Sequence, residues 1–154
     1  MKTIIKRALA LCLTAAMTAL LLAGCGPKQE MPSSGGDDTS IVLTDQAGRT
    51  VTLEKSADRV VSVYYLSTSV LVALGAQDKV GGLEQKADSR GLYQMAAPEL
   101  IDLPAVGSGK GVNVEETAAL EPDVVILPMK LAEQAEQFEK LNIPCLVVDP
   151  ETLD

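Results

Sequence analysis

Residues 124–148, VVILPMKLAEQAEQFEKLNIPCLVV, hold the pattern that decides the fold of this chain. The continuous apolar run at 124–127 is typical of a strand buried on both faces of a parallel sheet. An amphipathic helix is predicted from Lys130 to Leu141, and a second strand at 144–148. The apolar face of that helix is predicted to hold Leu131, Ala135, Phe138 and Leu141. A strand, a helix and a strand with such short connections predict a right-handed βαβ crossover.

The segment before this unit starts the same alternation. RVVSVYY at 59–65 predicts a buried strand, and the apolar spacing that follows predicts a helix from Val70 to Gly75. Ser67 or Thr68 would cap the start of this helix, and Gly75 would end it.

The chain between these two units continues the pattern. It predicts a strand at 79–83, a helix at 88–100 that stops or bends near Pro98, a loop at 104–111 and a helix at 114–120. Asn113 is the candidate N-cap of the last helix, and Glu116 follows it at capping-box spacing.

Two β-prone runs around a glycine-containing loop predict a β-hairpin over 41–57. The alternation over 58–154 predicts an α/β fold, a three-layer Rossmann-like lobe with a parallel sheet covered by helices.

The first residues have the layout of a lipoprotein signal. Basic residues precede an uncharged, apolar run at 8–24, and 22–25 reads LAGC, the form of a lipobox. Residues 1–24 are predicted to be the signal peptide and Cys25 the lipidated residue. The alternative, a retained membrane span, needs about 20 apolar residues, and this run is shorter. Residues 25–40 are predicted to be a lipid-anchored flexible tether, which places the protein at the extracytoplasmic face of the cell membrane.

Composition excludes several functions. The signal contains three of the 13 basic residues and none of the 21 acidic ones, so the mature chain has a formal charge of −11, which argues against a nucleic-acid partner. The chain has no His, and Cys145 is the only thiol left after removal of the signal and lipidation of Cys25. These facts exclude a transition-metal site, a His-based catalytic triad and an intrachain disulfide. Cys145 lies in an apolar run and is predicted to be buried and inert.

Five motifs in order carry a family resemblance. They are DRVVSV at 58–63, ALGA at 73–76, LPAVG at 103–107, VNVE at 112–115 and LEPDVVI at 120–126. Together they resemble the iron-complex/vitamin B12 type of periplasmic-binding domain. The resemblance implies a class III binding protein of an ABC importer, non-enzymatic and with no intrinsic cofactor, whose ligand lies between two lobes. It implies a ferric siderophore, haem or a corrinoid as ligand, and ABC permease subunits as partners. Residues 58–154 would be the N-terminal lobe, truncated where the family begins a long helix.

Candidate cleft residues follow from the strand pattern itself. Ligands of open α/β sheets lie outside the carboxyl ends of the strands. The loops predicted there contain Tyr64, Tyr65, Ser67, Ser108, Lys110, Met129 and Lys130. A tyrosine could stack on a flat ligand, although alternation could bury one of the two in the core. The lysines could meet a negatively charged ligand, or could be solvated surface residues.

Glu115 falls in the first turn of the helix that Asn113 would cap. A carboxylate there is favoured by the helix dipole. The family resemblance implies a second role, docking onto arginines of the permease.

Two other functions stay open beside the receptor. One is a hydrolase based on carboxylates, which no catalytic motif supports. The other is a single lobe that acts as a protein-interaction module or a non-functional truncated receptor.

Overall fold

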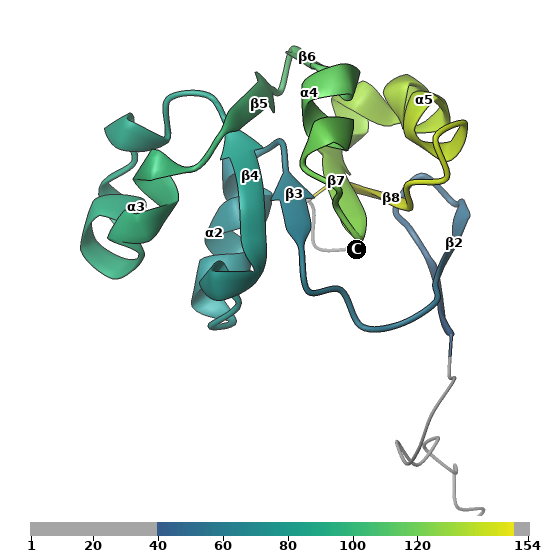
Figure 1. The fold of residues 1–154 in the computed structure, drawn as a ribbon, viewed down its shortest axis with the longest axis horizontal. Helices are drawn as coiled ribbons and strands as arrows, with labels where there is room; N and C mark the ends of the chain where they lie inside the picture. The colour runs from purple at the N-terminus through teal and green to yellow at the C-terminus, as the bar shows by residue number, and fades with distance from the viewer. Residues whose placement is uncertain (1–39, 150–154) are drawn as a thin grey trace, which may run out of the picture. The chain divides into compact units, whose positions relative to one another are not determined.

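A six-stranded sheet lies at the centre of the described chain, residues 40–149, in this computed structural model (Figure 1). The strand order is β6-β5-β4-β3-β7-β8. The strands are β3 (Val60–Ser62), β4 (Val80–Glu84), β5 (Ala105–Ser108), β6 (Gly111–Val112), β7 (Val124–Pro128) and β8 (Cys145–Val148). All neighbours pair in parallel except β5 and β6. The predicted signal peptide, Cys25, most of the tether and residues 150–154 lie outside the described residues.

Helices cover both faces of the sheet and make three layers (Figure 1). On one face, α2 (Tyr65–Ala73) and α3 (Gly91–Ala96) pack over a cluster that includes Leu83, Tyr93 and Leu100. On the other, α4 (Val114–Ala119) and α5 (Ala135–Glu139) pack over a cluster that includes Val125 and Phe138. The predicted α/β class, with its three-layer Rossmann-like lobe, is confirmed.

The predicted hairpin is present as β1 (Ile41–Thr44) and β2 (Thr50–Leu53), paired antiparallel. Its turn contacts β8, because the Gln46 N–H donates to the Val147 carbonyl (3.1 Å) and the Val147 N–H donates to the Asp45 carboxylate (3.1 Å). The hairpin is therefore fastened to the edge strand of the main sheet.

The strand predicted at 59–65 and the helix predicted after it begin and end at other residues than expected. β3 covers only Val60–Ser62, and α2 starts at Tyr65 instead of Val70. Thr68 is not a cap: it lies inside the helix, fully buried, and its N–H donates to the Tyr64 carbonyl. Gly75 does end the helix. Its φ of +71° and the bonds from Gly75 N–H to Val72 O and from Ala76 N–H to Leu71 O form a Schellman motif.

The predicted loop at 104–111 was wrong, because β5 and β6 form a small hairpin there and β6 makes the sheet mixed. Gly107 permits the close pairing. A Cβ at Gly107 would lie 2.6 Å from the carbonyl oxygen of Gly111.

The two longest predicted helices are interrupted. The segment predicted at 88–100 divides into a 3-10 turn η2 (Ala87–Ser89), α3 and a 3-10 turn η3 (Pro98–Asp102). Pro98, which lacks an N–H, starts the second turn. The segment predicted at 130–141 is a 3-10 helix η4 (Met129–Gln134) followed by α5. Leu131, Ala135 and Phe138 are buried as predicted, but Leu141 lies beyond the end of α5 and is half exposed.

The helix α4 agrees with its prediction. Asn113 is its N-cap, and the Asn113 Oδ1 accepts the N–H of Glu116 at 3.2 Å. The second half of the capping box does not form, because the Asn113 N–H already donates to the Val106 carbonyl (2.8 Å). The remaining short element is η1 (Gln77–Lys79).

Within residues 40–149, every helix falls short of the length and apolar character that a membrane crossing requires.

Candidate ligand-binding site

A cavity of about 450 Å³ lies at the carboxyl edge of the main sheet. Its wall is built from the ends of β4 and β5 and from the residues that follow β3 and β7. The chain moves outward from β3 through β4 to β5 and then returns to the other side of β3 with β7. Such a reversal is the place where open α/β sheets bind their ligands. We call this space the cleft cavity.

Five predicted site residues come together in the wall of the cleft cavity: Tyr64, Tyr65, Ser108, Lys110 and Lys130. Two others do not. Ser67 is buried inside α2, and its hydroxyl has no hydrogen-bond partner among the described residues. Met129 follows β7, is partly exposed and lies outside the wall.

The two tyrosines both reach the cleft cavity. Their rings meet edge to face, with centroids 5.1 Å apart and an interplanar angle of 71°. Both side chains are half-buried, so neither is lost to the core. They offer an aromatic surface against which a flat ligand could stack.

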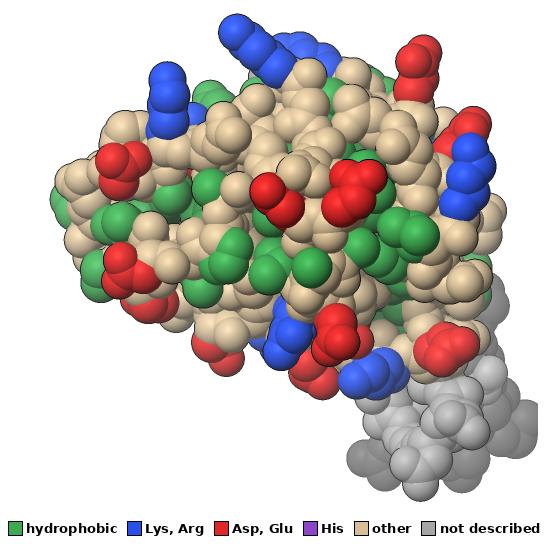
Figure 2. Space-filling view, turned by 45° about the horizontal axis from the view of Figure 1, so that its top comes forward, with side chains coloured by type: hydrophobic (Ala, Val, Ile, Leu, Met, Phe, Trp, Pro, Cys, Tyr) green, Lys and Arg blue, Asp and Glu red, His purple; other side chains and the backbone are tan. Residues whose placement is uncertain are grey.

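The cleft cavity has an excess of positive charge. Lys86, Lys110 and Lys130 are exposed, and none of them forms an ion pair with a carboxylate of residues 40–149. Arg90 is a fourth basic residue in the wall, and Glu84 is the only carboxylate that residues 40–149 contribute to it. On the face shown in Figure 2, acidic side chains are spread widely and basic ones stand near the margins. Among the described residues, four cations against one carboxylate, on a chain of net charge −8, make this cavity suited to an anion.

Sequence reasoning missed Glu84, Lys86 and Arg90. Glu84 ends β4, so the rule that selected residues after the other strands would have selected it as well. Lys86 follows with a left-handed backbone, φ 65°, which is uncommon for a residue with a side chain. Nothing in the local sequence pattern distinguishes Arg90.

Glu84 is the centre of a buried polar network. Its carboxylate is almost fully buried and accepts hydrogen bonds from the Tyr93 hydroxyl (2.8 Å) and the Thr68 hydroxyl (2.9 Å). Burial, together with the nearby Glu84 carboxylate, holds the pKa of Tyr93 well above its usual value. The Tyr93 phenol therefore stays protonated and donates to Glu84. Through the hydroxyls of Tyr93 and Thr68, Glu84 links the end of β4 to α3 and α2.

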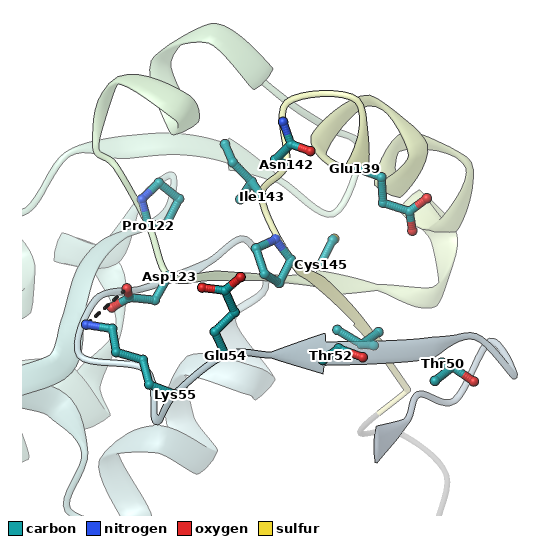
Figure 3. Close-up of a pocket in the computed structure, with 12 residues that line it drawn as sticks. Thr50, Thr52, Glu54, Lys55, Pro122, Asp123, Glu139, Asn142, Ile143 and Cys145 are labelled. Atoms are coloured by element: carbon teal, nitrogen blue, oxygen red, sulfur yellow. Dashed lines mark ion pairs between the residues drawn. The ribbon is translucent and has the colours of Figure 1, made fainter. Parts of the chain in front are cut away.

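A larger cavity, of about 730 Å³, lies at the opposite edge of the sheet (Figure 3). It is bounded by β2 and by the residues that precede β7 and β8, and Glu54 and Asn142 lie at its sides. Of its charged groups, Lys55, Asp123 and Glu139 form ion pairs within the described residues, whereas Glu54 forms none there. Asp123 accepts the backbone N–H groups of Asp58 (2.9 Å) and Arg59 (2.8 Å), which lower its pKa, and it lies 3.8 Å from Lys55. This cavity lacks both the carboxyl-edge position and the unpaired cations of the cleft cavity.

Cys145 lies in the wall of this larger cavity but is almost fully buried. Burial raises the pKa of its thiol to about 12, so the thiol stays protonated at neutral pH. The predicted buried, free Cys145 is confirmed.

Two further observations bear on the predicted sites. Glu115 is exposed in the first turn of α4, as a docking role requires. Within the described part of the chain, no three His, Cys, Asp or Glu side chains are grouped to hold a metal ion.

Comparison with known proteins identifies the family. The profile of a family described as "Periplasmic binding protein" matches residues 60–152. The molybdate-binding protein MolA of Haemophilus influenzae is 30% identical over 114 residues, which are 72% of this chain and 32% of MolA. The petrobactin-binding protein YclQ of Bacillus subtilis is 29% identical over 136 residues, 86% of this chain and 41% of YclQ.

Solved structures agree with this assignment. MolA with bound molybdate superimposes with a TM-score of 0.65 at 29% identity, covering 71% of this chain and 34% of MolA. A periplasmic solute binding protein from Veillonella parvula gives a TM-score of 0.66 at 30% identity, covering 75% of this chain and 37% of that one. The chain thus spans about a third of the length of MolA. It belongs to the periplasmic binding protein family, whose members are non-enzymatic binding components of transport systems.

Proposed function

We propose that this chain is the N-terminal lobe of a lipid-anchored substrate-binding protein that delivers an anionic metal species to an ABC permease. The observation that carries the proposal is the charge of the cleft cavity, to whose wall the described residues contribute four basic side chains, one carboxylate and two tyrosine rings. Lysines and an arginine around an aromatic surface suit a ferric siderophore, a haem with its propionates or a metal oxyanion. An uncharged corrinoid would leave these cations without a partner.

The relatives support this chemistry. One of them is named for binding molybdate and another for binding petrobactin. A third is an ABC transporter substrate-binding lipoprotein of Bacillus subtilis, 30% identical over 114 residues, which supports both the transporter and the lipid anchor at Cys25. The docking role of Glu115 on the permease belongs to the same proposal.

A titration tests the ligand class. The only aromatic fluorophores of note are three tyrosines, since the chain has no Trp, and two of these line the cleft cavity. The full chain in detergent is titrated with molybdate, ferric petrobactin, haemin and cyanocobalamin, up to millimolar ligand because a lobe a third the length of MolA offers only part of the contacts. Free N-acetyltyrosinamide corrects for absorption by the ligand.

We expect a saturable response to at least one anionic ligand, weakened by added salt, and none to cyanocobalamin. Lys110→Glu should lower the affinity. Lys140→Glu, which changes charge equally on an exposed residue outside the cavity wall, should leave it unchanged. The proposal is wrong if no anion gives a saturable response, or if cyanocobalamin does.

A further inference from the structure

Arg90 differs from the other arginines of the described chain. Residues 40–149 contain Arg49, Arg59 and Arg90. The guanidinium of Arg49 donates to Asp45, Glu139 and the Cys145 carbonyl, and that of Arg59 donates to the Leu120 carbonyl at 2.9 Å. The Arg90 guanidinium makes no hydrogen bond within the described residues, and its Nε is fully buried without an acceptor.

Arg90 is nevertheless held in place. Its guanidinium carbon lies 4.3 Å from the centroid of the Tyr65 ring, a cation–π contact. Its Nε lies 3.8 Å from a carboxylate oxygen of Glu84, which is close enough for attraction and too long for a hydrogen bond. The side chain is 37% exposed and forms part of the cleft cavity wall.

The two contacts fix the plane of the guanidinium without using its donors. A guanidinium carries five N–H donors in a rigid fork that fits two oxygens of an anion. Donors left unpaired beside a cavity, on a group already held in position, are suited to a ligand that brings its own acceptors.

Glu84 is held by other hydrogen bonds and therefore leaves the N–H donors of Arg90 unpaired. Its two oxygens are occupied by the hydroxyls of Tyr93 and Thr68, at 2.8 and 2.9 Å. The carboxylate is therefore fixed by β4, α2 and α3 and attracts Arg90 from a distance. A freely rotating carboxylate could instead close a bidentate pair with Arg90 and consume the donors that a ligand needs.

We propose that Arg90 binds the oxygens of the anionic ligand directly, and that Glu84 is a positioning residue that orients Arg90 against Tyr65. The inference rests on the proposed function and adds the specific contact. It selects ligands that present two adjacent oxygens of shared negative charge, as an oxyanion or a siderophore carboxylate or catecholate does. The alternative is a structural arginine that only ties the start of α3 to β4.

NMR can observe Arg90 itself. The full chain, labelled with ¹⁵N in detergent micelles, is titrated with molybdate and with the gallium(III) complex of petrobactin, a diamagnetic substitute for the ferric complex. We expect the Nε–H signal of Arg90 to shift with a saturable profile. The Nε–H signals of Arg49 and Arg59, whose guanidinium groups are already hydrogen-bonded, serve as internal controls and should stay in place.

Three variants distinguish a ligand-binding role of Arg90 from a purely structural one. Arg90→Lys keeps the charge and loses the fork, so it should weaken anion binding about tenfold or more. Arg59→Lys is the matched control and should bind as the parent does. Glu84→Gln removes a negative charge, which on charge alone would strengthen anion binding. The positioning role predicts weaker binding and a displaced Arg90 Nε–H signal before any ligand is added.

The outcomes are distinct. This inference is overturned, and the proposed function stands, in either of two cases. In the first, the anion shifts the backbone signals of Tyr65 and Ser108 but not the Nε–H signal of Arg90. In the second, Arg90→Lys binds the anion with the affinity of the parent. Stronger binding by Glu84→Gln overturns the positioning role. If no cleft signal responds to either anion, the proposed function and this inference are both wrong.

Discussion

Replacing Asp45 by Ala should destabilise the lobe more than the loss of any surface carboxylate. The Asp45 side chain is fully buried in the turn between β1 and β2. One oxygen accepts the N–H groups of Ala47 (3.0 Å) and Arg49 (2.8 Å). The other accepts the N–H of Val147 (3.1 Å) and the Arg49 guanidinium (2.6 Å). Removal therefore breaks a buried ion pair and leaves three backbone donors without this acceptor.

The magnitude follows from those contacts. Breaking a buried ion pair costs about 3–5 kcal/mol. Arg49 is 24% exposed and keeps Glu139 at 2.7 Å, so it retains a partner and the lower end of the range applies. We expect the free energy of unfolding to fall by about 3 kcal/mol, measured by urea denaturation at pH 7 with far-UV circular dichroism. That loss is large beside the stability of about 5–15 kcal/mol of ordinary domains.

The effect should depend on pH in a stated direction. Burial by itself raises the pKa of Asp45, but the hydrogen bonds from Arg49 and Val147 outweigh it and the pKa lies below its usual value. The stabilisation is therefore fully present above the unfolded-state pKa of about 3.9 and is lost as the pH falls through the folded-state pKa. The difference between the parent and Asp45→Ala should be constant from pH 7 to about pH 5 and should shrink in stronger acid.

Asp58→Ala is the matched control. Asp58 is 73% exposed and lies 3.3 Å from Lys79 and 3.7 Å from Lys55, so its loss should cost less than about 1 kcal/mol. The reasoning is refuted if Asp45→Ala costs no more than Asp58→Ala, or if its cost does not shrink in acid.

Three further predictions concern other parts of the fold. Gly107→Ala should lower the free energy of unfolding by about 1–3 kcal/mol, because a Cβ would collide with the backbone of β6. Gly91→Ala is the control, since its Cβ would meet no atom within 4 Å, and equal urea midpoints for the two variants would contradict this prediction. Cys145 should resist iodoacetamide at pH 8 until guanidinium unfolds the chain, because burial raises its pKa to about 12; peptide mapping that finds rapid alkylation of the folded chain would contradict it. Glu115→Arg should reduce ligand uptake in cells that carry the complete transporter, while Glu116→Arg, its exposed neighbour in α4, should not; unchanged uptake by Glu115→Arg would remove the docking role.

Two features could be predicted from the sequence: the parallel sheet and the edge of that sheet at which the candidate site lies. The apolar runs of β7 and β8 identified a parallel sheet. The rule that loops at carboxyl strand ends share one edge brought Tyr64, Lys110 and Lys130 to one cavity, although 66 positions separate the first from the last. That rule needs no knowledge of side-chain packing.

The sequence was less informative where tertiary contacts decide. The break near Pro98 was expected, but the 3-10 conformation of residues 87–89 and 129–134 was not, because apolar periodicity does not separate a 3-10 turn from an α-helix over so few residues. β6 has only two residues, too few to show a strand pattern. Arg90 owes its place to Tyr65 and Glu84, which belong to other elements, so no local spacing could identify it.

The most direct test of the central claim, that the carboxyl-edge cavity binds an anionic metal species, is a crystal structure of the chain grown with molybdate or ferric petrobactin, with anomalous data at the molybdenum or iron edge. We predict an anomalous peak in the cleft cavity, within contact of Arg90 and between the tyrosine rings and Lys110. A peak in the cavity beside Glu54, or none under conditions where titration shows binding, would contradict the account.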